Sequence, residues 1–229
     1  MRLSQVGNLR LILLAVCSGT IDAVAFVRLG NVFASVITGN LILLGVSIAR
    51  GAGRSALVAG CALAAYAIGV VAFAPHRDAD ARPEPGEHWP RAVTFVLSCE
   101  FALLVVLTVG WEVTGGRPGQ LMQLLLLAAA AAAMGAQSSA IRRLGPVSTT
   151  YLTSTFIATL EALARGRWSA VELRSLAILG AALAGALVAV ELIMHAPRLV
   201  PVLALVPLAG AIVVRGRATA GAARPADTS

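Results

Sequence analysis

Two carboxyl groups lie inside long apolar stretches of the sequence, and they are the side chains best placed to do chemistry. Asp22 lies about two thirds of the way along the apolar stretch 9–27, and Glu100 lies nine residues into the stretch 92–113. A charged group at the centre of a membrane helix costs about 2.5–3.5 kcal/mol on insertion scales, so such groups usually face a bundle interior or an aqueous cavity. We therefore predict that Asp22 and Glu100 bind a solute, a cation or a proton.

Each carboxyl group also has a structural interpretation. Asp22 is only six residues from Arg28, so it could form a salt bridge near the lipid headgroups. Glu100 could be a neutral glutamic acid that is hydrogen-bonded to a backbone carbonyl or a serine. Interfacial solvation better explains two other glutamates near the ends of apolar stretches: Glu161 beside Arg165 and Glu191 beside His195.

Polar residues interrupt two short apolar stretches at matching places. Thr38 and Asn40 lie in one, and Thr153 lies at the same position in the other. In a membrane such a turn can open and offer backbone and side-chain groups to a solute, as in the discontinuous helices of transporters. The alternative is an ordinary packing face of small and hydroxyl residues. We predict a shared central site that also includes Gln137, the counterpart of Asp22.

These matching places belong to a long internal similarity. Residues 9–51 align without a gap onto residues 124–166 at an offset of 115, with 13 identical pairs. Each copy contains an Arg-Leu-Gly turn, and Gly30 and Gly145 permit the positive φ angle that such a turn often needs. The arginine before each turn is expected to anchor to lipid phosphate, with capture of an anionic solute as the alternative.

The composition indicates a membrane protein. Hydrophobic residues form 58% of the chain and charged residues 13%, whereas soluble domains are about a quarter charged. The net charge of +7 comes from arginine alone, and most arginines fall in short gaps between apolar stretches. The expected partners are therefore the lipid bilayer and a small solute or proton, not nucleic acid, because no segment is both soluble and long enough to form a basic domain. A homo-oligomer is compatible with the sequence.

We predict an all-α integral membrane protein, a polytopic helical bundle of two sequence repeats in a bacterial inner membrane. The repeats are expected at 1–115 (core 9–51) and 116–214 (core 124–166), followed by a disordered tail at 215–229. The eight apolar stretches are 9–27, 32–49, 56–74, 92–113, 121–141, 147–163, 176–194 and 199–214.

The number of spans is left open by the sequence, since six, seven or eight are compatible with these stretches. Four spans per half would make the repeats parallel, and three per half, with one segment that dips in and returns, would make them inverted. The distribution of arginine favours a cytoplasmic N-terminus.

Several missing motifs argue against enzymatic activity. The chain has no lysine and therefore no phosphate-binding GxxxxGK loop, and no serine has the GxSxG pattern. The three histidines and three cysteines lack the spacing of metal ligands, so we predict neither a metal site nor a cofactor. An intramembrane enzyme is the least favoured alternative.

Specific motifs in both halves resemble a known family. They are Ser18-Gly19-Thr20-Ile21-Asp22-Ala23, Phe33, Thr38-Gly39-Asn40, Met134-Gly135-Ala136-Gln137, Arg143 and Thr149-Thr150-Tyr151-Leu152-Thr153. Over about residues 9–194 the chain resembles the YoaK family of bacterial inner-membrane proteins. The resemblance implies a polytopic membrane protein of unestablished biochemical role, often grouped with transporters. The second half departs from the pattern, because Ser154 lies opposite Gly39 and Thr155 opposite Asn40.

Together these observations predict a permease-like carrier for a small solute, with proton coupling as an option. The alternative is a membrane scaffold or partner subunit that transports nothing, in which the polar groups only hold helices together.

Overall fold

The chain is mainly helical in the part that the structure describes. The computed structural model describes residues 5–74, 90–143, 152–166 and 169–214. The helices are α1 (Gln5–Arg28), α2 (Ile37–Ala49), α3 (Gly53–Ala72), α4 (Arg91–Val113), α5 (Gln120–Arg142), α6 (Leu152–Ala164), α7 (Ala170–His195), the short 3₁₀ helix η2 (Pro197–Leu199) and α8 (Val200–Val213). Each predicted apolar stretch overlaps one α-helix, which confirms the all-α fold class. The predicted tail at 215–229 lies outside the described residues.

Helix length separates membrane-crossing helices from shorter ones. Five helices, α1, α3, α4, α5 and α7, are long and apolar enough to cross a bilayer. The 13 residues of α2 and of α6 rise only about 20 Å, which is too short for a hydrocarbon core of about 30 Å. Helix α8 is also short, but with η2 it extends from one end of the bundle to the other. At its start Trp111 Nε1 donates to Pro197 O, and at its end Arg10 donates to Val214 O.

A capping box moves the start of α7 beyond its apolar stretch. The Ser169 hydroxyl accepts a hydrogen bond from the Val171 backbone N–H, and the Glu172 carboxylate accepts one from the Ser169 N–H. This reciprocal pairing satisfies amide groups that the first turn of a helix leaves free. The helix therefore begins at Ala170, six residues before the start predicted from hydropathy.

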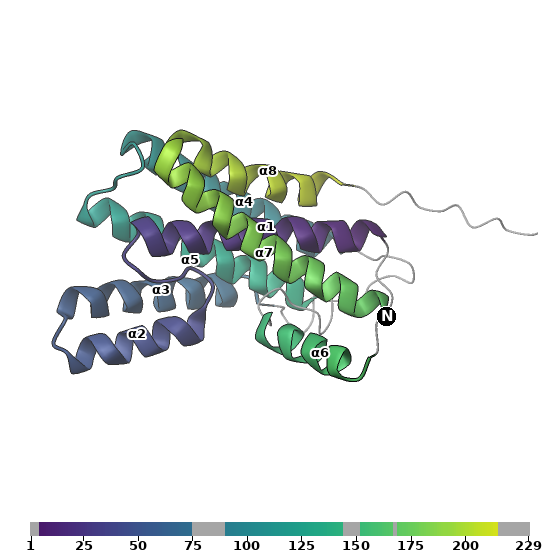
Figure 1. Cartoon of the computed structure of the whole chain (residues 1–229). Coiled ribbons are helices and arrows are strands. Elements are labelled where there is room, and N and C mark those ends of the chain that lie inside the picture. The colour runs from purple at the N-terminus through teal and green to yellow at the C-terminus, as the bar shows by residue number, and fades with distance from the viewer. Residues whose placement is uncertain (1–4, 75–89, 144–151, 167–168, 215–229) are drawn as a thin grey trace, which may run out of the picture.

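The helices pack in a reciprocal pattern between the two halves of the chain. Helix α1 packs against α7 and α8 of the second half, and its counterpart α5 packs against α3 and α4 of the first half (Figure 1). Helices α4 and α8 close one side of the bundle, while α1 and α5 contact each other only sparsely. The short helices α2 and α6 lie on the outside, against α3 and α7 respectively.

Hydrogen bonds at the helix ends give the directions of these helices. Gln123, at the start of α5, donates to the carbonyl of Arg28 at the end of α1, so α1 and α5 are antiparallel. Arg174 and Asn8 pair near the starts of α7 and α1, so these two helices are parallel. Corresponding helices of the two halves thus run in opposite directions. We call the end where α1 begins the N-terminal end, and the opposite end the Arg28 end.

Glycine lets the parallel helices α1 and α7, and likewise α3 and α5, approach very closely. A Cβ atom on any of four glycines would lie only 2.0–2.4 Å from a backbone carbonyl oxygen of the facing helix. The pairs are Gly19 with Ala182, Gly185 with Val16, Gly135 with Tyr66, and Gly69 with Ala132. The pair Gly135 with Tyr66 corresponds to Gly19 with Ala182, and the pair Gly69 with Ala132 corresponds to Gly185 with Val16. Corresponding residues are 116 positions apart in the sequence, one more than the offset of the sequence alignment. The same close crossing therefore occurs twice, as small residues at membrane helix interfaces permit.

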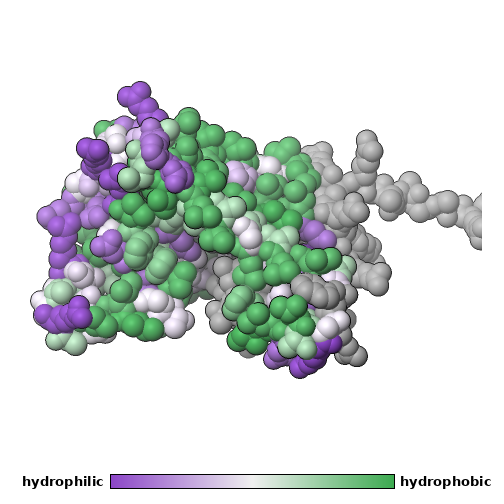
Figure 2. Space-filling model, viewed as in Figure 1, coloured by the Kyte–Doolittle hydropathy of each residue, from purple (hydrophilic) through white to green (hydrophobic). Residues whose placement is uncertain are grey.

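The outer surface of the bundle is apolar. Large hydrophobic side chains are exposed along all the long helices, including Val71 at 72%, Val113 at 76% and Leu121 at 72% exposure. Figure 2 shows hydrophobic residues over most of the visible flank and hydrophilic residues gathered towards the end on the left. In water such a surface would be a large aggregation-prone patch, whereas in lipid it is the stable state. The molecule is a multi-pass membrane protein.

Candidate functional site

Asp22 holds a segment of chain that folds back along α1. Its carboxylate accepts hydrogen bonds from the backbone N–H groups of Ala34 and Ser35, both at 2.8 Å, and from the Ser35 hydroxyl. This carboxylate is therefore well satisfied by the non-helical segment 29–36 and has no ion pair with Arg28. The structure assigns Asp22 a structural role of a kind that sequence reasoning did not consider.

Asn40 completes the support of the same segment. Its side chain is fully buried, accepting from the Phe33 N–H at 2.9 Å and donating to the Phe33 carbonyl at 2.6 Å. One amide side chain thus satisfies both backbone groups of a residue that has no helical or strand partner. The ring of Phe33 also stacks on Phe26 of α1, with 5.1 Å between centroids. Unpaired backbone groups are costly in lipid, so these contacts are what allow a non-helical segment at this depth.

The turn that begins this segment is tight. Gly30 has φ of +118° and Asn31 has φ of +58°, so the turn at Gly30 is confirmed. A Cβ at Gly30 would also lie 2.6 Å from a methyl group of Val58, which closes the turn against α3. The second predicted turn, at Gly145, lies outside the described residues.

Together these contacts make α2 a re-entrant segment. Asp22 precedes the end of α1 by six residues, or about 9 Å of helix rise, so residues 33–35 lie that far inside the Arg28 end. Helix α2 starts there and returns to the same end, where Arg54 of α3 donates to Gln123. The structure thus favours three crossing helices per half in inverted orientation over four parallel ones.

Glu100 has the opposite environment from Asp22. Its side chain is fully buried on α4, and neither carboxyl oxygen has a hydrogen-bond partner among the described residues. The thiol of Cys17 on α1, itself buried, lies close enough to Glu100 to interact with it electrostatically. Neither the backbone carbonyl nor the serine that sequence reasoning proposed as a partner contacts Glu100.

Gln137 lies beside the same part of α1. Its side-chain nitrogen donates to the Leu14 carbonyl at 3.3 Å, and its side-chain oxygen is buried without a partner. Leu14 and Cys17 are one turn apart, so Gln137 of α5 and Glu100 of α4 both lie near this part of α1. We call Glu100, Gln137 and Cys17 the buried polar cluster. Thr20, one turn further along α1, is also buried, but its hydroxyl lies near the carbonyls of Val16 and, on α7, Gly185.

The other predicted site residues lie apart from this cluster. Thr38 is exposed on α2. The side chain of Thr153 lies outside the described residues, so the predicted meeting of Thr38 with Thr153 stays a prediction. Glu161 pairs with Arg165 at 3.2 Å and Glu191 with His195 at 3.3 Å, and all four side chains are exposed. Their position at the lipid interface stays a prediction.

Sequence reasoning missed the partners that define these environments. Ser35 and Phe33 carry the contacts of the re-entrant segment, and Cys17 was considered only as a metal ligand, for which its spacing is unsuitable. One local signal could have indicated that Asp22 holds a returning segment of chain: a polar residue that is followed by an interrupted apolar stretch. Among the described residues, no group of three or more His, Cys, Asp or Glu side chains is placed to hold a metal ion.

Comparison with known proteins bears on the family but not on the chemistry. The model of a family described as a protein of unknown function, DUF1275, matches residues 10–214. The UPF0700 transmembrane protein YoaK of Bacillus subtilis (strain 168) is 30% identical over 158 residues, which cover 67% of this chain and 66% of that protein, slightly less than two thirds of its length. No solved structure matches the chain. The chain therefore belongs to the family of proteins of unknown function DUF1275, and it is similar to the transmembrane protein YoaK.

Proposed function

We propose that this protein is a small-solute permease of a bacterial inner membrane and that Glu100 binds the proton to which transport is coupled. One observation carries the proposal: a carboxyl group lies fully buried in a membrane bundle, and neither of its oxygens is hydrogen-bonded to any described residue. Such a group adds no hydrogen bond between helices and is expensive to bury, so intramembrane carboxyls of this kind are functional candidates. We propose carriage, not catalysis.

The surroundings of Glu100 favour proton binding over permanent charge. An ionised carboxylate without a donor or a positive partner is strongly disfavoured in a low-dielectric interior, so the buried form is the neutral acid. Ionisation requires water or a donor to reach the carboxyl group. The side-chain oxygen of Gln137, which has no partner among the described residues, is a further polar group in the buried polar cluster. Helices α1 and α5 contact each other only sparsely. A rearrangement between α1 and α5 would therefore couple hydration of the cluster to release of the proton.

The inverted arrangement of the halves supports a transport function. Transporters built from inverted repeats alternate between two related conformations, with discontinuous segments near the middle of the membrane. Here the two parallel crossings at glycine repeat between the halves, and a short helix accompanies each of them. We infer that the two halves are internal repeats related by a twofold axis in the membrane plane. The axis would pass between α1 and α5.

The same topology strengthens the proposal that the N-terminus is cytoplasmic. When each of the 18 arginines in the sequence is assigned to the helix end that it adjoins along the chain, 13 adjoin the N-terminal end and five adjoin the Arg28 end. Cytoplasmic loops are enriched in Lys and Arg. Modification of single cysteines at position 51, in the turn between α2 and α3, from the outside of intact cells tests this orientation.

The coupling proposal is tested in liposomes that contain the purified protein and an enclosed pH-sensitive dye. Single solutes from a panel of amino acids, sugars and organic acids are added outside, and proton entry is recorded. Glu100→Gln keeps the size of the side chain but cannot release a proton. Glu112→Gln is the matched control, because Glu112 is on the same helix and is exposed. We expect solute-dependent proton entry that falls at least tenfold in Glu100→Gln and stays unchanged in Glu112→Gln.

Two results would count against this function. Equal proton entry in Glu100→Gln and the native protein would remove Glu100 from the coupling step. The absence of flux with every solute in the panel would favour the alternative, a membrane scaffold that transports nothing. The close glycine crossings and the fully satisfied contacts of Asp22 and Asn40 are what favour that alternative, since they serve helix packing alone.

A further inference from the structure

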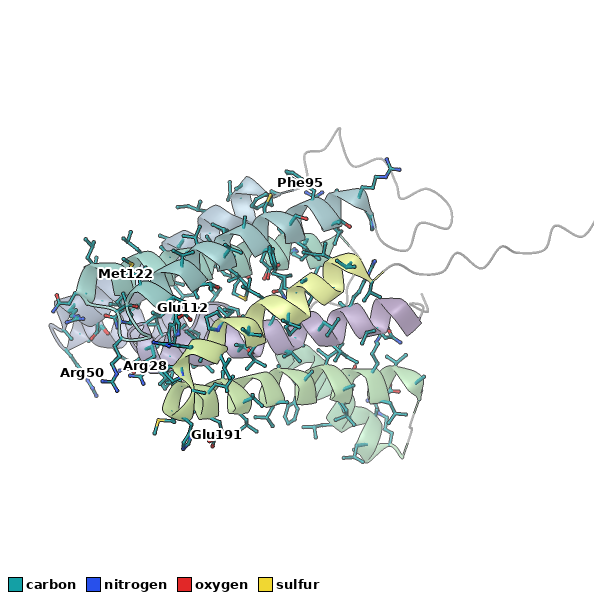
Figure 3. The ribbon with its side chains drawn as sticks, turned by 90° about the horizontal axis from the view of Figure 1, so that it is seen from above. Arg28, Arg50, Phe95, Glu112, Met122 and Glu191 are labelled. Atoms are coloured by element: carbon teal, nitrogen blue, oxygen red, sulfur yellow. The ribbon has the colours of Figure 1, made fainter. Side chains whose placement is uncertain are left out.

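A cavity of about 370 Å³ opens at the Arg28 end of the bundle. It lies between the end of α1, the turn that joins α4 to α5, and the end of α7. Its lining residues are Arg28, Gly115, Gly116, Arg117, Ile193, Met194 and Pro197. In Figure 3, Arg28 is at the same end of the bundle as Glu112 and Glu191. The volume is in the range of small-molecule sites.

Two arginines in this cavity carry charge that no described residue neutralises. In the part of the chain that the structure describes, the Nε atom of Arg28 is buried without a hydrogen-bond partner. Within the described residues, neither Arg28 nor Arg117 uses its side chain in a hydrogen bond or an ion pair. The two glutamates at this end do not neutralise the arginines, because Glu191 pairs with His195 and Glu112 does not line the cavity. A buried donor without a partner is costly, so its presence indicates a ligand that completes it.

The rest of the wall offers no competing donors. The backbone N–H groups of residues 115, 116 and 117 each donate to a carbonyl of the preceding turn. The indole N–H of Trp111 donates to the Pro197 carbonyl at 2.8 Å, which ties the α4–α5 turn to the start of η2. Among the described residues that line the cavity, the guanidinium groups of Arg28 and Arg117 are therefore the donors that remain free. The backbone around the cavity is already held in place by hydrogen bonds. Apolar Ile193 and Met194 form the opposite face.

We propose that this cavity binds the phosphate group of an anion through Arg28 and Arg117. A guanidinium can donate two parallel hydrogen bonds to phosphate, and two such groups match a doubly charged or diester phosphate. The position at the ends of membrane helices, with an apolar wall beside the charges, suits the phosphate of a lipid headgroup as well as a soluble phosphate. The site is independent of the proposed transport step, because Glu100 lies 13 residues, or about 20 Å of helix, before the end of α4.

The test uses the full chain purified in a neutral, phosphate-free detergent and isothermal titration calorimetry with three probes. These are inorganic phosphate, short-chain phosphatidylglycerol, and short-chain diacylglycerol, which lacks the phosphate. The variants are Arg28→Gln, Arg117→Gln, the double variant, and Arg28→Lys, which keeps the charge but not the paired donors. Arg50→Gln is the control, because Arg50 is exposed at the same end but does not line the cavity.

We expect at least one phosphate-bearing probe to bind, and its affinity to fall at least tenfold in the double variant, less in Arg28→Lys, and less than twofold in Arg50→Gln. Binding of inorganic phosphate would identify a soluble anion, and binding of phosphatidylglycerol alone would identify a headgroup. Equal binding of diacylglycerol, equal loss in Arg50→Gln, or no binding of either phosphate probe would overturn the proposal. Thermal unfolding of each variant separates loss of the site from loss of the fold.

Discussion

Asp22 and Glu100 are both carboxylic acids within membrane helices, but their surroundings differ in kind. Asp22 accepts three hydrogen bonds from one returning segment of chain, whereas Glu100 has no partner for either oxygen. The first is explained completely by architecture, because without it the segment 29–36 would leave backbone N–H groups unpaired in lipid. The second is explained by no contact in the described chain. Position in an apolar stretch therefore does not distinguish these two carboxyl groups, whereas their hydrogen-bond partners do.

The largest effect on stability is expected for Asp22→Ala. This change leaves two backbone N–H groups and one hydroxyl without their acceptor, and hydrogen bonds to charged groups contribute about 1.5–3 kcal/mol each in favourable cases. We expect the free energy of unfolding in detergent micelles to fall by about 3 kcal/mol. Glu112→Ala, an exposed change, is the control and should stay within about 0.5 kcal/mol of the native protein. If Asp22→Ala lowers the free energy of unfolding no more than the control does, the hydrogen bonds of Asp22 are dispensable for stability.

Asn40→Leu tests the second support of the same segment. Leucine has a similar size but offers neither a donor nor an acceptor, so the N–H and the carbonyl of Phe33 both lose their partner. We expect a loss of about 2 kcal/mol, measured by chemical unfolding, and faster hydrogen exchange at the Phe33 amide. If that amide exchanges as slowly as in the native protein, water or another group replaces Asn40.

Glu100→Leu should change stability in the opposite direction. Since Glu100 makes no hydrogen bond, the substitution removes a buried polar group and adds apolar contact in the bundle. We expect stabilisation of about 1 kcal/mol, seen as a higher midpoint of thermal unfolding, together with loss of proton-coupled transport. A clear destabilisation would mean that Glu100 has structural partners in the membrane and would place it in the same class as Asp22.

Thr38→Val should have the smallest effect. The side chain is exposed on α2 and differs from valine mainly by one hydroxyl group. We expect a change within about 0.5 kcal/mol in unfolding and no change in transport. Loss of transport in a stable Thr38→Val variant would restore Thr38 to the functional site and would extend that site from the buried polar cluster to the re-entrant segment.

The inverted arrangement shows where hydropathy reasoning stops. Hydropathy marks residues 32–49 as one apolar stretch, but only residues from Ile37 onward are helical, because Asp22 and Asn40 supply the hydrogen bonds of residues 33–35. The start of α7 was misplaced for the converse reason, since a capping box extends a helix into polar sequence. In both cases side-chain hydrogen bonds to the backbone, which hydropathy does not measure, decided where the helix begins.

By itself the sequence determined that the chain is a multi-pass membrane protein, its helical class and the positions of the eight apolar segments, because these depend on the local free energy of moving side chains from water into lipid. It also identified Asp22, Asn40, Glu100 and Gln137 as the polar residues that need an explanation. Only the tertiary structure decided that α2 returns to the end where it entered and that corresponding helices run in opposite directions. It also decided that Asp22 has partners while Glu100 has none. These properties depend on which groups from distant parts of the chain meet, and that information is absent from any single stretch of sequence.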